Sequence, residues 1–164
     1  MSATLDLSTG IGDWTGTPTS TVPVLWAEPH AGHTWLGKND LFGSDAGEST
    51  FSLTFALTQA EGALWWASES NAACATFTLQ FVADDFVTSA ELNGHELERP
   101  GKQSSRDFAE LRAPRGAGLF VGGLNTLKVS VYSSGGPVGL YARGVLEIEC
   151  PPPSSPPSPP PPSP

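Results

Sequence analysis

Two adjacent tryptophans, Trp65 and Trp66, are the first candidates in this sequence for contact with a ligand. An indole ring on a protein surface offers a flat apolar area on which the apolar face of a pyranose can stack. Because neighbouring side chains of a strand point to opposite faces, one ring can enter the core while the other stays exposed. Trp35 is a third candidate of this kind. The alternative for all three rings is packing in the core or beneath a loop.

A pair of carboxylates, Asp84 and Asp85, raises the question of acid–base catalysis. Hydrolysis of a glycoside uses two carboxyl groups placed about 5–9.5 Å apart across the sugar. Neighbouring residues of a strand point to opposite faces, so this pair cannot flank one bond. The sequence also has no G-x-S-x-G motif, no phosphate-binding glycine loop before a helix and no Cys/His nucleophile set. We therefore expect a protein that is not an enzyme.

Oxygen ligands for a structural calcium ion can come from the acidic segment "NDLFGSDAGE", through Asp40, Asp45 and Glu48. Their spacing matches no defined calcium loop, and a loop without metal is the alternative. The histidines of "HAGH", His30 and His33, are only two, whereas a structural zinc needs four ligands. We expect no cofactor, with calcium as the candidate ion.

The charge of the chain argues against two classes of partner. Its 164 residues carry a formal net charge of −9, with eight lysines and arginines in total. A protein that follows a phosphate backbone needs a basic face, and none can be assembled from so few cations. The same shortage disfavours attraction to anionic membrane surfaces. We expect no nucleic acid and no membrane insertion among the interactions of this chain.

The sequence shows neither a membrane span nor a leader. No run of 18 apolar residues is present, which excludes a membrane-spanning helix. The first residues, "MSATLDLSTG", lack the basic and apolar regions of a signal peptide. This predicts either a mature or excised fragment with an added Met1, or a protein that is not secreted in the ordinary way.

Two cysteines, Cys74 and Cys150, permit one disulfide bond. Cys150 lies where the last predicted strand gives way to a proline-rich tail, which is a sensible place for a covalent link. Two independent buried thiols are the alternative.

Alternating apolar and polar residues indicate strands over most of the chain. The pattern is clear in residues 51–57, 77–83, 127–132 and 140–149, and Asn93-Gly94 is the preferred pair for a type I′ hairpin turn. The segment "SSGGPVG" is longer than a tight hairpin needs, and we expect a loop at the end of a sandwich from which the final strand pairs back. Many short antiparallel strands without a helical repeat predict an all-β fold, an antiparallel β-sandwich formed by residues 1–150.

Residues 151–164, "PPPSSPPSPPPPSP", are different in kind. Proline fixes φ near −65° and donates no backbone hydrogen bond, so runs of Ser and Pro favour extended polyproline II. Fourteen such residues would reach roughly 43 Å. The sequence therefore predicts two parts, a sandwich domain and a semi-rigid tail or linker.

Several motifs together resemble galactose-binding-domain-like β-sandwiches, which are jelly-roll modules of extracellular proteins. The motifs are "LSTGIGDW", "GALWWAS", "FVADDFVTSAELNGHEL" and "GGLNTLKVSVYSSGGPVGLYARGVLEIE". Ala83-Asp84-Asp85 through Asn93-Gly94 is similar to one family pattern, and residues 123–140 are similar to another. The resemblance spans about residues 7–149. It implies a jelly roll that serves as a carbohydrate-binding or accessory domain.

The tail resembles the hydroxyproline-rich shafts and linkers of green-algal cell-wall, extracellular-matrix and flagellar-surface glycoproteins. In that setting prolines are hydroxylated and carry short arabinose or galactose chains. The resemblance implies glycosylation within the tail, and the candidate positions are Ser154, Ser155, Ser158, Ser163, Pro151, Pro152, Pro153, Pro156, Pro157, Pro159, Pro160, Pro161 and Pro162.

These expectations lead to one function and two alternatives. We expect a non-catalytic extracellular carbohydrate-binding or adhesion module on a glycosylated proline-rich stalk, at a cell wall or a cell or flagellar surface. Its partners are then a glycan or other wall and matrix glycoproteins. The first alternative is a structural subunit of a wall, flagellar fibre or virion surface that assembles with itself or other chains. A small glycan-active enzyme is the second.

Overall fold

The computed structural model describes residues 2–9, 13–15, 17–19, 31–37, 46–57, 74–100, 103, 106–114, 118–135 and 138–149. Within these residues the regular structure is entirely β, with no helix, which confirms the all-β prediction. No helix that could cross a membrane occurs in the ranges given above. The tail of residues 151–164 lies outside them.

The described part of the chain contains eleven strands. They are β1 (Ser2–Asp6), β2 (Asp13–Trp14), β3 (Thr17–Thr19), β4 (Trp35–Gly37), β5 (Gly47–Leu57), β6 (Ala75–Asp84), β7 (Phe86–Leu92), β8 (His95–Glu96), β9 (Ala109–Ala113), β10 (Gly123–Ser133) and β11 (Gly139–Glu149).

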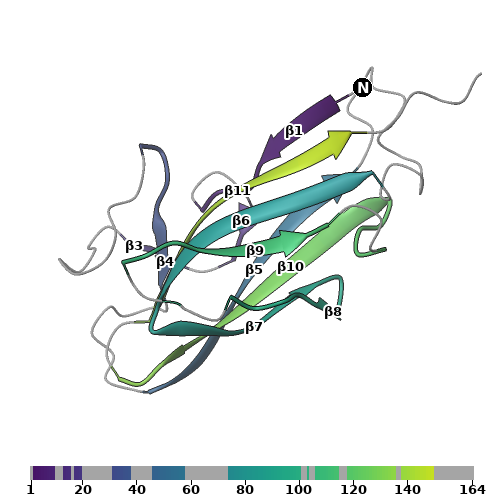
Figure 1. Ribbon diagram of the computed structural model, residues 1–164. Coiled ribbons are helices and arrows are strands. Elements are labelled where there is room, and N and C mark those ends of the chain that lie inside the picture. Colours follow the sequence, from purple (N-terminus) through teal and green to yellow (C-terminus); the bar gives the residue numbers. More distant parts are fainter. Residues whose placement is uncertain are drawn as a thin grey trace, which may run out of the picture.

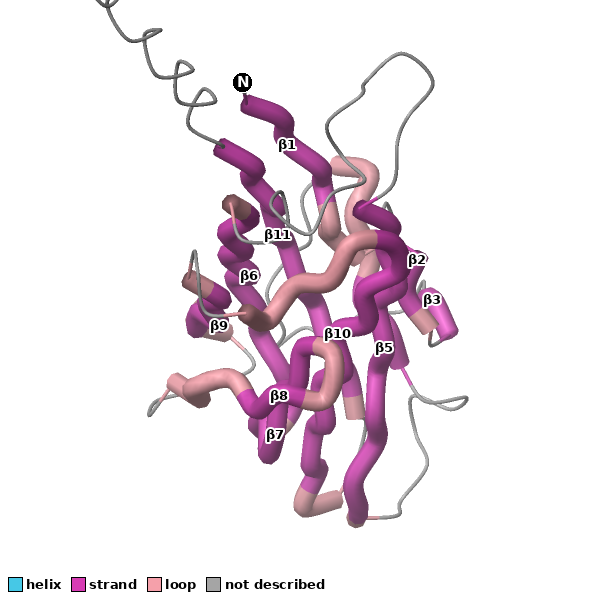
Figure 2. The backbone as a smooth tube through the Cα atoms, turned by 90° about the vertical axis from the view of Figure 1, so that its right-hand side faces the viewer, coloured by secondary structure: helices cyan, strands magenta, loops and turns pink. Residues whose placement is uncertain are grey.

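These strands form two antiparallel sheets (Figure 1). The six-stranded sheet has the order β3-β4-β11-β6-β9, with β1 also paired to β11. The five-stranded sheet has the order β2-β5-β10-β7-β8. Figure 2 shows β9 and β6 on one side of the molecule and β5 on the other. The arrangement is consistent with a β-sandwich.

Alternation along each strand explains why the two sheets pack together. In β10, Leu127, Val129 and Val131 are fully buried, while the residues between them face outward. Burying an aliphatic side chain of this size contributes about 1.5–3 kcal/mol, so inward rows from both sheets form one core. Core members include Leu36, Phe51, Leu53, Phe55, Leu57, Phe77, Leu79, Phe81, Val87, Leu92, Leu111, Leu140, Leu146 and Ile148.

Two turns show how the chain passes between strands. Asn93 and Gly94 have φ angles of 53° and 80°, as a type I′ turn between β7 and β8 requires, which confirms that prediction.

The expectation that the final strand, β11, pairs back onto the preceding strand, β10, after "SSGGPVG" is wrong. β10 pairs with β5 and β7, whereas β11 pairs with β6, β4 and β1 in the other sheet. A connection longer than a tight hairpin lets the chain cross the sandwich end.

Gly144 of β11 lies opposite Leu79 of the neighbouring strand β6, whose side chain occupies the space that a side chain at position 144 would need. A Cβ at this position would lie 2.6 Å from Cδ1 of Leu79 and 3.6 Å from Cβ of Leu7. Both leucines are buried, with exposures of 0% and 1%, so neither can move aside easily. The absence of a side chain at Gly144 is therefore needed for this packing.

Candidate functional site

Most residues selected from the sequence lie outside the described residues. These are Trp65 and Trp66, the calcium candidates Asp40 and Asp45, His30, Cys150 and the glycosylation candidates of the tail. Their roles stay predictions.

Trp35 is buried rather than available to a ligand. Its exposure is 0%, and its ring packs against Tyr141 with centroids 5.8 Å apart. A ring without exposed surface cannot stack on a sugar, so the structure corrects the prediction that Trp35 offers a binding platform. Leu36 of β4 enters the core between the sheets, whereas Trp35 lies on the opposite side of the strand, where its packing against Tyr141 contributes to its burial.

Trp35 belongs to an aromatic group on the outer side of the six-stranded sheet. Tyr141 is fully buried at its centre, and its hydroxyl lies 3.4 Å from Nδ1 of His33. The ring of Phe108 meets Tyr141 edge-on at 5.7 Å, and the guanidinium of Arg143 lies 4.2 Å above Phe108. Edge-on rings and a stacked cation stabilise each other. We interpret this group as packing that stabilises the sheet.

Cys74 takes part in a disulfide bond. The strand that begins next to it, β6, has Ala75 opposite Ile148, near the end of β11. The register therefore brings the chain before Cys150 close to Cys74. The pairing of Cys74 with Cys150 itself stays a prediction.

Glu48, the third calcium candidate, lies exposed near the start of β5. Its carboxylate accepts a hydrogen bond from the hydroxyl of Thr88. Among the described residues no group of three or more acidic, histidine or cysteine side chains could hold a metal ion. A calcium site with Asp40 and Asp45 stays a prediction.

The outer side of the five-stranded sheet carries a continuous polar surface, which we call the β5–β10–β7 face. Its side chains alternate with core residues of the same strands, and they are hydroxyl-bearing, charged or aromatic. The members are Glu48, Thr50, Ser52 and Thr54 of β5, Thr126, Lys128, Ser130 and Tyr132 of β10, and Phe86, Thr88 and Glu91 of β7.

An aromatic pair lies at one end of this face. Tyr132 is the register partner of Phe86 in β7 and of Glu48 in β5, so the three residues form one row across the sheet. The two rings have centroids 5.4 Å apart and are inclined by 36°. Phe86 is 41% exposed and Tyr132 is half-buried. The pair thus presents apolar ring surface to solvent.

Hydroxyl groups surround the aromatic pair. The hydroxyls of Thr50 and Ser130 are 3.0 Å apart on neighbouring strands. The Thr88 hydroxyl lies 3.2 Å from the carbonyl oxygen of Ser130 and also binds Glu48, whose side chain therefore extends across β10. Ring surface beside hydroxyl and carboxylate groups is the combination that recognises a polyhydroxylated ring, since the rings cover its apolar face and the polar groups bind its hydroxyls.

A set of hydrogen bonds fixes the end of the face that carries the rings. Ser134 donates from its backbone N and its hydroxyl to Oδ2 of Asp85, at 2.7 and 2.6 Å. The backbone N of Asp85 donates to the carbonyl of Tyr132 at 2.9 Å. Hydrogen bonds from Ser134 hold the pKa of the Asp85 carboxyl below its ordinary value, because they favour the charged form. Asp85 thus fixes the junction between β6, which ends at Asp84, and β7 of the other sheet.

The free edge of β7 is also held in place. The register shifts between Ser130 and Val131, which marks a bulge beside Thr88. Gln103 accepts from the backbone N of Val87 at 2.6 Å and donates to its carbonyl at 3.2 Å. Arg99 donates to the carbonyl of Thr88 at 2.5 Å. Side chains therefore satisfy backbone groups that a further strand would otherwise take.

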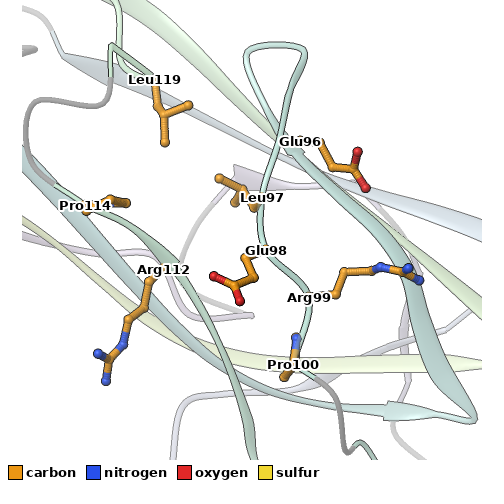
Figure 3. Close-up of a pocket in the computed structure, with 8 residues that line it drawn as sticks. All are labelled: Glu96, Leu97, Glu98, Arg99, Pro100, Arg112, Pro114 and Leu119. Atoms are coloured by element: carbon orange, nitrogen blue, oxygen red, sulfur yellow. The ribbon is translucent and has the colours of Figure 1, made fainter.

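A cavity of about 590 Å³ opens between the segment after β8 and the end of β9 (Figure 3). In Figure 3 Leu119 and Pro100 lie at opposite ends of the view, with Leu97 and Glu98 between them. Arg112 pairs with Glu110, and Arg99 is bound to β7. Its lining residues within the described part of the chain include no aromatic ring and so offer no stacking surface; they are Glu96, Leu97, Glu98, Arg99, Pro100, Arg112, Pro114 and Leu119.

Sequence reasoning did not select Phe86 and Tyr132, although a signal was present. Tyr132 continues the outward series of Lys128 and Ser130 in an alternating strand. Phe86 is the register partner of Tyr132, and pairing between distant strands cannot be read from either segment alone.

Comparison with known proteins gives no match: no protein-family model, no curated protein and no solved structure is similar to this chain at a significant level.

Proposed function

We propose that this protein is a non-catalytic carbohydrate-binding module and that the β5–β10–β7 face is its binding surface. The observation that carries the proposal is the exposed ring pair of Phe86 and Tyr132, in one row with Glu48 and beside the hydroxyls of Thr88 and Ser130. A flat, exposed arrangement of this kind suits the side of a glycan chain.

We also assign the sandwich to the jelly-roll type. Four strands of one sheet have the order β4-β11-β6-β9, and four of the other have the order β5-β10-β7-β8; from β4 to β11 the chain changes sheet after every strand except β7. This order of eight strands supports two interlocked Greek keys, the organisation of a jelly roll. Lectin domains are among the proteins that use this architecture.

We also propose that the domain is held at a cell surface or wall by its proline-rich tail. The Ser/Pro composition of residues 151–164 supports a glycosylated polyproline II stalk that holds the domain away from a cell wall or a cell or flagellar surface. The ligand is then a glycan or a glycoprotein of the same wall or matrix. Direct contact of this sandwich with nucleic acid is disfavoured by the net charge of −9.

The test is binding of the purified chain to an array of wall oligosaccharides, both neutral fragments of galactan, xylan, mannan and β-glucan and acidic fragments that carry carboxylate or sulfate groups. The proposal predicts concentration-dependent binding to at least one of them, without release of sugar. Absence of binding to every glycan of the array would contradict it, and release of reducing sugar would favour an enzyme instead.

A second candidate function, an assembling structural subunit, is favoured by exposed apolar side chains away from the aromatic pair. Leu124 at the start of β10 is 66% exposed, and Val121 just before it is 45% exposed. Apolar surface of this kind is typical of contacts between proteins. Light scattering of the full chain and of a chain without residues 151–164 distinguishes the functions. If residues 151–164 are only a stalk, their removal leaves the number of chains per particle unchanged. If they are a docking segment that holds copies together, their removal reduces the particle to a monomer.

A further inference from the structure

The β5–β10–β7 face carries a charge distribution that bears on the kind of glycan it can accept. Glu48 is in register with Tyr132, and its carboxylate is held over the face by the Thr88 hydroxyl. Asp85 precedes Phe86 directly, in the bend between β6 and β7, and hydrogen bonds from Ser134 hold the pKa of its carboxyl below the ordinary value. One negative charge therefore lies on the face beside the aromatic pair, and a second lies at the end of the face where β7 begins.

Positive charge is sparse on the same face. Lys128 is four residues from Tyr132 along β10, about 13 Å at 3.3 Å per residue, and its register partner in β7 is the carboxylate Glu91. Arg99 is at the edge of β7, where it donates to the carbonyl of Thr88. The chain as a whole adds a net charge of −9. A carboxylate or sulfate on a ligand above the rings would meet repulsion from Glu48, reinforced by Asp85 at the end of the face, and the described residues of the face place no cation opposite it.

Neutral groups, in contrast, find partners on this face. The hydroxyls of Thr50, Thr88 and Ser130 can each donate or accept, as a sugar hydroxyl can. The carboxylate of Glu48 accepts only, and a sugar hydroxyl can donate to it. A neutral chain would therefore gain the ring contact and the polar contacts together.

We propose that the β5–β10–β7 face binds neutral glycans and discriminates against glycans that carry carboxylate or sulfate groups. This inference rests on the proposed function and specifies the substrate class of that same site. Carboxylates placed around a binding surface reject like-charged ligands by repulsion as well as by lost contacts.

The experiment compares matched ligands by titration calorimetry. Fragments of β-1,4-galactan and β-1,4-glucan are used as prepared and after oxidation of C6 to the carboxylate, at 20 mM and at 500 mM NaCl. We expect the oxidised form of the bound chain to bind at least about tenfold more weakly at low salt, with a smaller difference at high salt because salt screens exposed charges. Glu48→Gln keeps an acceptor oxygen without the charge and should reduce the discrimination.

The outcomes separate this inference from the proposed function. If an oxidised chain binds as tightly as its neutral parent, or more tightly, the inference is overturned while carbohydrate binding stands. A difference that neither high salt nor Glu48→Gln reduces would also overturn it, because the discrimination would then not be electrostatic. If neither form of any chain binds, the proposed function itself fails. The effect of salt on the affinity difference is measured with the wild-type protein, so this test does not depend on the folding of the Glu48→Gln variant.

Discussion

Asn93 donates a hydrogen bond from its side-chain amide to Oδ1 of Asn125, 2.7 Å away. The contact links the β7–β8 turn to the start of β10, two segments more than thirty residues apart in sequence. Asn93 also donates to the carbonyl of Leu119, and its Oδ1 accepts from the backbone N of Thr126. Asn125 is fully buried, accepts from the backbone N of Val121 and donates to the carbonyls of Val121 and Gly123. Asn93 and Asn125 therefore link the β7–β8 turn to the start of β10.

Replacement of Asn125 by alanine should lower the free energy of unfolding by about 2–4 kcal/mol, because it leaves buried donors and acceptors without partners. Urea denaturation followed by tryptophan fluorescence measures this change. Lys128→Ala, an exposed change on the same strand, is the control and should stay within about 0.5 kcal/mol. Equal stabilities of the two variants would contradict the structural role of the asparagine link.

Replacement of Gly144 by alanine should destabilise the domain by about 1–3 kcal/mol, since the added methyl group would overlap Leu79 in a well-packed core. Val145→Ala on the same strand is the matched control, because Val145 is 40% exposed and loses little burial. Thermal unfolding monitored by circular dichroism gives the comparison. An unchanged midpoint for Gly144→Ala would show that the Leu79 side chain does not lie as close to position 144 as described.

The lowered pKa of the Asp85 carboxyl should make the stability of the folded protein depend on pH. Folding lowers its pKa from the ordinary value of 3.8, with the Ser134 hydroxyl bond as the largest cause. The stabilisation is therefore fully present above that ordinary value and is lost as pH falls through the lower pKa of the folded state. Asp85→Asn removes the titration, so the stability difference between wild type and variant should shrink in acid. A difference that stays constant from about pH 6 to pH 2 would contradict this account.

A disulfide between Cys74 and Cys150 should stabilise the folded protein. If Cys74 pairs with Cys150, the bond closes a loop of about 75 residues and should contribute roughly 4 kcal/mol to stability, mainly through the unfolded chain. Peptide mapping by mass spectrometry without reductant should find the two cysteines in one linked fragment. Two free thiols in the denatured, unreduced protein would exclude the bond.

Local pattern was enough to predict much of the fold. Alternation in residues 127–132 placed the inward and outward residues of β10 correctly, and Asn93-Gly94 predicted the turn, because both signals are complete within a few residues. The partner of the last strand was not predictable in this way. β11 lies between β4 and β6 because of pairings over long sequence separations, which composition does not encode.

The candidate site was less predictable than the fold for the same reason. A tryptophan was the natural choice for a stacking platform, yet Trp35 is buried because its strand is covered on both faces. Phe86 and Tyr132 form an exposed pair only because a register between two strands brings them together. Exposure and juxtaposition are tertiary properties, and single residues do not reveal them.

The most direct test of carbohydrate binding on the β5–β10–β7 face is titration calorimetry of the double variant Phe86→Ala/Tyr132→Ala with the neutral oligosaccharide that the wild type binds. Leu124→Ala is the matched control, an exposed apolar residue on the outer side of the same strand, eight residues from Tyr132. The account predicts that the double variant loses at least about tenfold in affinity, or about 1.4 kcal/mol, because the contact surface of two rings is removed, whereas Leu124→Ala binds as the wild type does. Wild-type affinity in a folded double variant would contradict the account.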